Sequence, residues 1–346
     1  MNELLLKEQQ KFLSQKLENS TVTVSGATGL IGSRIVKYLL VLNKKYDSNI
    51  TINALYRSID KFNNVYKDYL DDNALKSVYF DTQTPLDGKT DYIIHCAGIA
   101  GGKKMHLKDP VLMFDVAYYS TKAMLEYAVK SGCKRFCYIS TYEVYGTPVD
   151  DRLISENNPC TLDTMQLRNI YPIGKRMCES MCVAYSSMYG LDIMCGRLTS
   201  TFGYGVEYDD PRFFAEFARC AVNKKDIVLK SMGNTVRSYL DSDDAASAFL
   251  YILVNGESCN TYNTTNMDNE ISIREIAEKV ISLSGENVNL VFDVAEDIEK
   301  LGFRKEGVTL MDASKLYALG WKPVYTLDDT LNKLIDTIKE KNADSN

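Results

Sequence analysis

The sequence lacks the features that mark several large classes of protein. No apolar run approaches the roughly 18 residues that a helix needs to cross a bilayer, so we predict no membrane partner. The formal net charge is −6, without the basic excess that favours nucleic acid or membrane surfaces, so we predict neither as a partner. The nine cysteines stand at no spacing typical of a metal site. We therefore expect no bound metal, and buried, reduced thiols in a cytoplasmic protein.

The first twenty residues lack the apolar segment and the small-residue cleavage site of a signal peptide. Leucine alternates there with lysine, glutamate and glutamine. This pattern predicts a short amphipathic helix, residues 1–20, that extends the fold at its N-terminal side.

What the sequence does contain is an alternation of strand and helix patterns over a chain of 346 residues. Strands are predicted at 21–24, 50–56, 77–80, 91–95, 135–140 and 191–195, and helices at 30–42, 59–70, 110–131 and 171–189. Such alternation predicts an α/β fold, a Rossmann-type doubly wound parallel sheet over residues 21–199. Beyond residue 200 the pattern loosens, with loops near 204–210 and 233–234. We expect residues 200–346 to form mainly a smaller substrate-binding lobe, with some later segments returning to the sheet.

A glycine-rich turn joins the first predicted strand to the first predicted helix. Glycines at three-residue spacing permit a tight turn, close approach to a pyrophosphate and close helix packing, while the helix N-terminus favours phosphate charge. The strand before the turn and the helix after it favour a dinucleotide over an empty turn. The predicted cofactor-binding residues of this turn are Gly26, Ala27, Thr28, Gly29, Leu30, Ile31 and Gly32.

Three later strand ends complete the predicted cofactor site. Arg57 follows the second strand, where an arginine is able to pair with a 2′-phosphate, so the cofactor is NAD or NADP, with NADP favoured. Asp81 and Thr82 follow the third strand, near the expected adenine. Small residues end the fourth strand, where the cofactor backbone would pass; they are Cys96, Ala97 and Gly98.

A tyrosine and a lysine four residues apart open the helix predicted at 171–189. Tyr171 and Lys175 therefore lie on one helix face. A nearby ammonium and a cationic nicotinamide favour the phenolate, which is able to take a proton from a sugar hydroxyl as hydride leaves. Thr141, after the fifth strand, offers a hydroxyl that would orient the substrate.

The glycine turn, Thr141 and the Tyr171–Lys175 pair together resemble the NAD-dependent epimerase/dehydratase branch of the extended short-chain dehydrogenases. The resemblance covers residues 21–339 and implies that Thr141, Tyr171 and Lys175 form the catalytic triad, with Tyr171 and Lys175 also touching the cofactor. It implies that Arg237 holds the substrate diphosphate and that helices 110–131 and 171–189 pair across a homodimer. Asp244 and the Tyr262–Asn263 pair also match the family. Ala117 and Ser200 stand where many members carry asparagine; Ser200 is the expected substrate contact.

Glu143 separates the subclasses that the resemblance implies. A glutamate two residues after the catalytic hydroxyl resembles nucleotide-sugar 4,6-dehydratases and UDP-glucuronate decarboxylases, which implies a catalytic Glu143 and a 4-keto intermediate. Tyr142 stands where dTDP-glucose dehydratases place aspartate. A nucleotide-sugar 4-epimerase and an NADPH-dependent keto-sugar reductase are the alternatives. A dinucleotide-sensing protein without catalysis is a third, but such proteins typically lose the Tyr/Lys pair.

Overall fold

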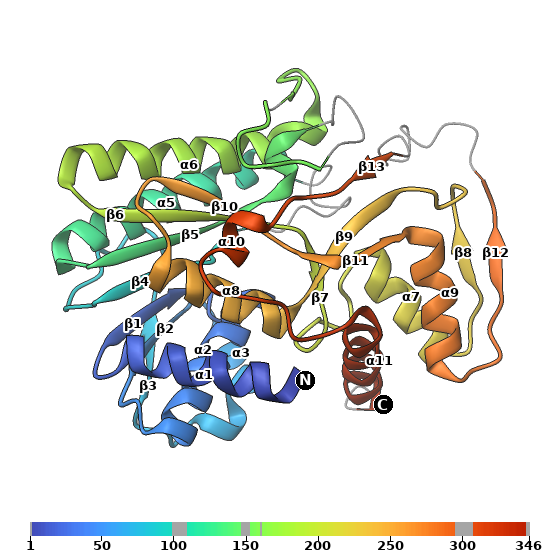
Figure 1. Cartoon of the computed structure of the whole chain (residues 1–346), viewed down its shortest axis with the longest axis horizontal. Coiled ribbons are helices and arrows are strands. Elements are labelled where there is room, and N and C mark those ends of the chain that lie inside the picture. The colour runs from blue at the N-terminus through green and yellow to red at the C-terminus, as the bar shows by residue number, and fades with distance from the viewer. Residues whose placement is uncertain (1, 99–108, 147–152, 160, 295–306, 344–346) are drawn as a thin grey trace.

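The computed structural model describes residues 2–98, 109–146, 153–159, 161–294 and 307–343. Within these residues, seven parallel strands form one large sheet in the order β10-β6-β5-β4-β1-β2-β3 (Figure 1). Its strands are β1 Thr21–Ser25, β2 Thr51–Tyr56, β3 Leu75–Tyr79, β4 Tyr92–His95, β5 Arg135–Thr141, β6 Asp192–Leu198 and β10 Asn260–Thr264. The predicted Rossmann-type sheet is confirmed. The strand order reverses between β1 and β4, and sheets of this kind bind ligands in a crevice at the carboxyl ends of the strands beside such a reversal.

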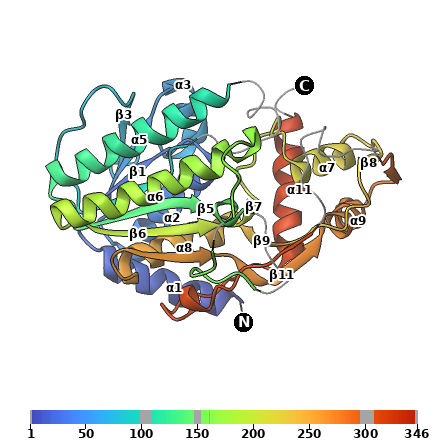
Figure 2. The same ribbon diagram turned by 90° about the horizontal axis from the view of Figure 1, so that it is seen from above.

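Helices cover both faces of the large sheet. Figure 2 shows α5 and α6 side by side on one face, and Figure 1 places α1, α2 and α8 beyond the other. These helices are α1 Asn2–Leu17, α2 Leu30–Tyr46, α5 Pro110–Ser131, α6 Ile170–Tyr189 and α8 Ser242–Asn255, with the shorter α3 Ile59–Val65 after β2. The central strands are accordingly buried on both sides; the whole of β5 after Arg135 is buried.

The N-terminal helix predicted from the leucine pattern is present as α1. Leu13 and Leu17 are fully buried, and the ring of Phe12 stacks on Tyr251 of α8 with centroids 5.0 Å apart. The Gln9 side chain donates a hydrogen bond to the carbonyl oxygen of Lys322 at 2.7 Å. The helix therefore forms an outer layer on α2 and α8.

A smaller lobe stands beside the carboxyl ends of the large sheet (Figure 1, right). In its described part, β9 lies centrally in a four-stranded sheet, and β8 and β12 form a separate parallel pair. Its elements are β7 Ser200–Phe202, α7 Phe213–Val222, β8 Ile227–Leu229, β9 Val236–Asp241, β11 Asn266–Ser272, α9 Ile273–Ser284, β12 Leu290–Phe292, β13 Val308–Thr309 and α11 Leu327–Ala343, with α10 Ser314–Tyr317 leading back from the large sheet. Phe202, Phe214 and Tyr239 centre its separate apolar core.

Two elements from beyond residue 200 belong to the large sheet. β10 pairs with β6 as the edge strand, and α8 packs against β5 and β6. Almost every residue of α8 from Asp244 to Leu253 is buried, so its sequence shows no polar face. Among the described helices, none is long and apolar enough to cross a membrane.

Candidate active site

The glycine turn lies where the strand order of the large sheet reverses. Gly26 has a φ of +64°, and a Cβ on it would lie 2.8 Å from the backbone nitrogen of Ala97. A Cβ on Gly32 would lie 2.3 Å from the carbonyl oxygen of Gly26. Gly29 is the N-cap of α2. These contacts leave no room for side chains and bring the amino end of α2 to the crevice, where a dinucleotide phosphate fits. The other predicted contacts here, Ala27, Thr28, Leu30 and Ile31, lie in the turn or in the first helical turn.

The ends of β2 and β3 lie side by side, because the N–H of Phe80 donates to the carbonyl oxygen of Tyr56 at 2.9 Å. Arg57 directly follows β2 and is exposed. The Asp81 carboxylate accepts hydrogen bonds from the backbone N–H groups of Thr84 and Gln83. These bonds, that of Thr84 first, lower the pKa of Asp81. Asp81 thus fixes its own turn, which includes Thr82 at a φ of +71°.

His95, the last residue of β4, links the glycine turn to α5. Its Nδ1 lies 2.6 Å from Ser25 Oγ, and its Nε2 lies 3.1 Å from Thr121 Oγ1. Burial, and secondarily the charge of Lys175, lower the pKa of His95 to about 3. The imidazole is therefore neutral at physiological pH.

The small residues after β4 pass between the glycine turn and α6. The N–H of Ala97 donates to Ser25 Oγ at 3.3 Å. Burial raises the pKa of the Cys96 thiol, so the thiol stays protonated. A Cβ on Gly98 would lie 3.4 Å from Lys175 Nζ, at the tight end of van der Waals contact. The end of β4 therefore connects the predicted cofactor site to the catalytic helix.

Lys175 lies buried under the carboxyl end of β5. Its Nζ donates to the carbonyl oxygen of Ile139 at 2.8 Å and stands 4.8 Å from the ring centroid of Tyr138. Burial lowers the pKa of Lys175. The ammonium is thus held by the backbone of β5, facing the residues that follow β4.

Tyr171 reaches the hydroxyl of Thr141, to which its side chain is hydrogen-bonded. Burial raises the pKa of Tyr171 and so does the charge of Glu143, whereas Thr141 and Arg212 lower it; the net change is upward. Tyr171 is therefore a neutral phenol in this structure. The phenolate expected from the sequence depends on a cationic nicotinamide as well as on the Lys175 ammonium.

A short turn carries the other two predicted catalytic residues. We call residues 141–145 the catalytic turn; after Thr141 it consists of the 3-10 helix η2, Tyr142–Tyr145. Thr141 caps this helix, since its Oγ1 accepts the N–H of Glu143 at 3.3 Å. Glu143 is half-buried and lies close enough to Tyr171 to raise its pKa. The structure thus brings Thr141, Glu143 and Tyr171 together.

Arg237 approaches the same place from β9. Its Nη1 donates to the Tyr142 hydroxyl at 3.2 Å. Tyr142 above all, with Tyr239 and Glu143, raises the pKa of Arg237 despite burial. Ser200, at the start of β7, lies opposite Tyr239 in the β7–β9 pairing and is half-buried. Of the predicted substrate residues outside the catalytic turn, Arg237 therefore contacts the turn directly, and Ser200 lies on the strand that pairs with β9.

Arg212 adds a further cation to Lys175 and Arg237, and it was not predicted from the sequence. Its guanidinium pairs with both carboxylate oxygens of Asp210, with Nη2 to Oδ2 at 2.6 Å, and stands 4.7 Å from the ring centroid of Phe214. Its charge lowers the pKa of Tyr171, so it acts on the catalytic phenol. No motif surrounds this residue; only the fold of the smaller lobe reveals its position.

Two residues that match the family by sequence have structural partners. The Asp244 carboxylate accepts the N–H groups of Val324 and Tyr325, and burial raises its pKa to about 8. Buried Asn263 accepts the Tyr145 hydroxyl at 2.7 Å. Both residues tie distant segments together beside the site. In the described residues, no three histidine, cysteine, aspartate or glutamate side chains gather as a metal site requires.

Comparisons with known proteins identify a family and a fold that this chain shares. Residues 22–267 match the family described as the NAD dependent epimerase/dehydratase family. UDP-glucuronic acid decarboxylase 1 of Xenopus tropicalis is 26% identical over 96% of this chain and 75% of that protein. The dTDP-D-glucose 4,6-dehydratase of Dictyostelium discoideum is 27% identical over 76% of this chain and 62% of its own length. The crystal structure of UDP-glucuronic acid 4-epimerase from Bacillus cereus with UDP-glucuronic acid and NAD superposes with a TM-score of 0.78, at 21% identity, covering 92% of this chain and 99% of that one.

Proposed function

Because this chain belongs to the NAD-dependent epimerase/dehydratase family of enzymes, we propose that it modifies a nucleotide-linked sugar through a 4-keto intermediate. The observation that carries the proposal is the convergence of Tyr171, Thr141 and Glu143 at one end of the large sheet, beside Arg237. A non-catalytic dinucleotide sensor would not require these side chains to lie together.

The proposed roles are those that the family resemblance implies, and the contacts described above support them. A bound nicotinamide supplies the hydride acceptor. Tyr171 takes the proton of the sugar C4 hydroxyl, and Thr141, bonded to it, orients that hydroxyl. Lys175 lies next to Gly98, a predicted cofactor contact, and would therefore face the bound cofactor. Arg237, next to Tyr142, would hold the substrate diphosphate. The close-packed glycine turn would carry the pyrophosphate on the N–H groups of α2.

Within the family, we favour a UDP-glucuronate decarboxylase-like or 4,6-dehydratase reaction. Both pass through chemistry at C5, next to the 4-keto carbon, and Glu143 is the carboxylate placed to carry a proton there. Tyr142 in place of aspartate weighs against elimination of a C6 hydroxyl. A 4-epimerase is the alternative. It needs no proton carrier at C5, so in that reaction Glu143 would not be catalytic.

For the cofactor, the family implies NAD, and the position of Arg57 supports NADP as an alternative. Arg57 stands directly after β2, where the ribose of a dinucleotide bound over the switch point lies in this fold. A reductase that consumes NADPH would release its cofactor after each turnover. A redox-neutral enzyme would retain it through purification.

We also propose a homodimer built on the face that α5 and α6 share. Apolar side chains stand exposed there; Val111 and Tyr119 on α5 and Val183, Met188 and Tyr189 on α6 each expose half or more of their surface. Burying such a patch against its symmetry mate is the common solution for a two-fold dimer. A single monomeric species in sedimentation at micromolar concentration would contradict it. The division at residue 200 into a dinucleotide domain and a mainly substrate-binding lobe, and a cytoplasmic location, remain predictions.

Product analysis with Glu143→Gln tests the reaction. The parent protein should release carbon dioxide from UDP-glucuronate, or water from a dTDP- or UDP-hexose, as mass spectrometry of the products would show. Glu143→Gln should still reduce the bound nicotinamide but turn over at least about 100-fold more slowly, stalling at the 4-keto sugar. Near-normal turnover of the variant, with inversion at C4 as the product, would replace this proposal by the 4-epimerase.

A further inference from the structure

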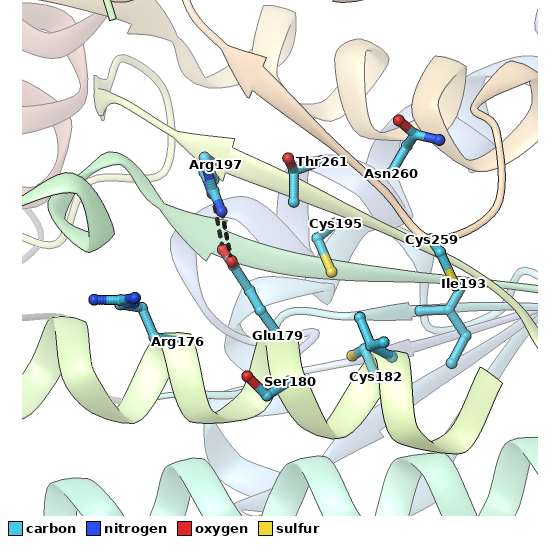
Figure 3. Close-up of a pocket in the computed structure, with 11 residues that line it drawn as sticks. Arg176, Glu179, Ser180, Cys182, Ile193, Cys195, Arg197, Cys259, Asn260 and Thr261 are labelled. Atoms are coloured by element: carbon cyan, nitrogen blue, oxygen red, sulfur yellow. Dashed lines mark hydrogen bonds and ion pairs between the residues drawn. The ribbon is translucent and has the colours of Figure 1, made fainter. Parts of the chain in front are cut away.

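A cavity of about 270 Å³ lies between α6, β6 and β10. Figure 3 shows Glu179 of α6 and Arg197 of β6 pointing toward each other at one end of it, with Cys182 and Cys195 further along. None of these residues belongs to the predicted site. Glu179 nevertheless stands one helical turn beyond Lys175, and Arg197 lies opposite Ser140 in the β5–β6 pairing. The ion pair is therefore placed directly behind the catalytic turn.

Glu179 and Arg197 form a two-pronged ion pair. Arg197 Nη2 lies 2.8 Å from Glu179 Oε2, and Arg197 Nε lies 3.1 Å from Oε1. The two side chains are only 11% and 12% exposed, so the pair is nearly dry. Burial alone would lower the pKa of Arg197, but Glu179 raises it above its ordinary value. Such a fork fixes direction as well as distance.

Each partner holds one end of the catalytic turn. Ser140 Oγ, one residue before Thr141, donates to Glu179 Oε1 at 2.5 Å. The Arg197 guanidinium lies over the ring of Tyr145, with its carbon 4.8 Å from the centroid. The segment between these two contacts contains Thr141 and Glu143. The ion pair therefore contacts Tyr145, the last residue of the turn, and Ser140, the residue directly before it.

The remaining donors of Arg197 fix the pair in one arrangement. Its Nη1 donates to the carbonyl oxygen of Glu156 at 3.1 Å, and the carboxylate of Glu156 accepts the N–H of Asn263. Asn263 in turn accepts the Tyr145 hydroxyl. The contacts of Arg197, Glu156, Asn263 and Tyr145 thus form a closed ring. This ring joins β6, β10 and the segment 153–159 to the catalytic turn.

We propose that Glu179 and Arg197 are positioning residues of the reaction, which hold the catalytic turn so that Thr141 and Glu143 face the substrate. This inference rests on the proposed function. Misplacing a catalytic group by about 1 Å costs about 100-fold in rate, so the pair need not touch substrate to matter. Because a buried ion pair contributes little net stability over apolar residues of similar volume, the two effects are separable.

The double variant Glu179→Leu with Arg197→Met separates positioning from stability. It leaves no unpaired charge, so its unfolding midpoint should stay near that of the parent. We expect kcat to fall by about 100-fold, with KM and dinucleotide affinity within about threefold of the parent. Arg135 and Asp192 form the matched control, since they pair at 2.8 Å across the opposite ends of the same two strands. Arg135→Met with Asp192→Leu should leave kcat near the parent value.

The cavity allows a second test, by chemical rescue. Arg197→Ala should regain turnover in millimolar guanidinium, because the cavity lined by Arg197 admits that ion beside Glu179. The parent and Arg135→Ala should not respond. Absence of rescue in a folded Arg197→Ala protein would contradict the assignment of the effect to this guanidinium.

Amide hydrogen exchange tests the positioning without any substrate. The N–H of Gly146 bonds to the carbonyl oxygen of Glu143, and that of Glu143 bonds to Thr141 Oγ1. Both should exchange at least about tenfold faster in the Glu179/Arg197 double variant than in the Arg135/Asp192 control. Equal exchange and equal kcat in the two double variants would overturn the proposal. A parent protein inactive on every nucleotide sugar would refute only the proposed function, because the exchange comparison would still stand.

Discussion

The two ends of the active-site crevice are built differently. The cofactor end uses backbone and small residues at close approach, as at Gly26, Gly32 and Ala97. The catalytic end uses charged or hydroxyl-bearing side chains from β5, η2, α6 and β9, and from Arg212 directly before α7. The cofactor end depends on the absence of side-chain atoms at its glycines. The catalytic end depends on the exact placement of a few side chains. Damage at the first should therefore appear as lost stability and binding, and damage at the second as lost turnover.

The largest effect should come from Tyr171→Phe, at the catalytic end. The change removes the hydroxyl that bonds Thr141 and leaves the ring, so turnover should fall by about two to four orders of magnitude. Dinucleotide affinity, measured by fluorescence titration, should hardly change. Tyr189→Phe, on the exposed end of the same helix, is the control and should behave as the parent. Near-parental turnover of Tyr171→Phe would remove this residue from the mechanism.

Gly26→Ala should have the largest effect on stability, at the cofactor end. The new Cβ would lie 2.8 Å from Ala97 N at a φ of +64°, so overpacking and left-handed strain should together cost roughly 2–5 kcal/mol in unfolding free energy. Gly132→Ala is matched, because Gly132 has a φ of +69° with nothing within 4 Å of a Cβ. It should cost only about 1–2 kcal/mol by urea denaturation. Equal losses would show that close packing at Gly26 is unimportant.

Arg57→Ala tests which dinucleotide the cofactor end binds. If the guanidinium meets a 2′-phosphate, the variant should lose about 1.5–3 kcal/mol of NADP binding energy and leave NAD binding unchanged. Calorimetric titration with both dinucleotides measures this directly. Tighter binding of NAD than NADP by the parent, or equal losses for both in the variant, would make Arg57 an ordinary surface cation.

The smallest effect should be a pH dependence of stability from His95. Its pKa is about 3 in the folded protein and, as a reference, about 6.5 when unfolded. The unfolded state therefore binds the extra proton, and the stabilisation present above pH 6.5 is lost as the pH falls. Between pH 7.5 and pH 6 this amounts to about 0.8 kcal/mol. Urea unfolding at the two pH values should show the difference, and His95→Asn should abolish it; an unchanged slope in the variant would assign it to other groups.

The sequence predicted the glycine turn and the strands of the large sheet better than the contacts between the two lobes, for a physical reason. The glycine turn and the strand ends are local patterns, and all six predicted strands are present with boundaries shifted by a few residues. Tyr171 and Lys175 could be paired from the sequence because a helix places residues four apart on one face, and both lie on α6. Arg212 was missed because its place beside Tyr171 depends on how the smaller lobe packs.

The elements beyond residue 200 were mostly missed for two further reasons. Strands such as β8 and β13 have three and two residues and pair with segments far away in sequence. α8 is buried nearly all round, so its sequence has no helical period. One signal was available: Ser272 and Glu275 form a capping box at the start of α9, as the spacing Ser-x-x-Glu predicts.

The position of β10 at the edge of the large sheet has a consequence for biosynthesis. A nascent chain is able to assemble β1 to β6 once residue 198 has emerged from the ribosome, but the outer edge of β6 stays unpaired until Asn260–Thr264 follow. Open edges of this kind recruit foreign strands. During this interval only β7, α7, β8 and β9 of the smaller lobe are synthesised, and the later partners of β8 and β9 do not yet exist. Both sheets therefore have unpaired strands at the same time, which makes this interval the period when a chaperone would matter most.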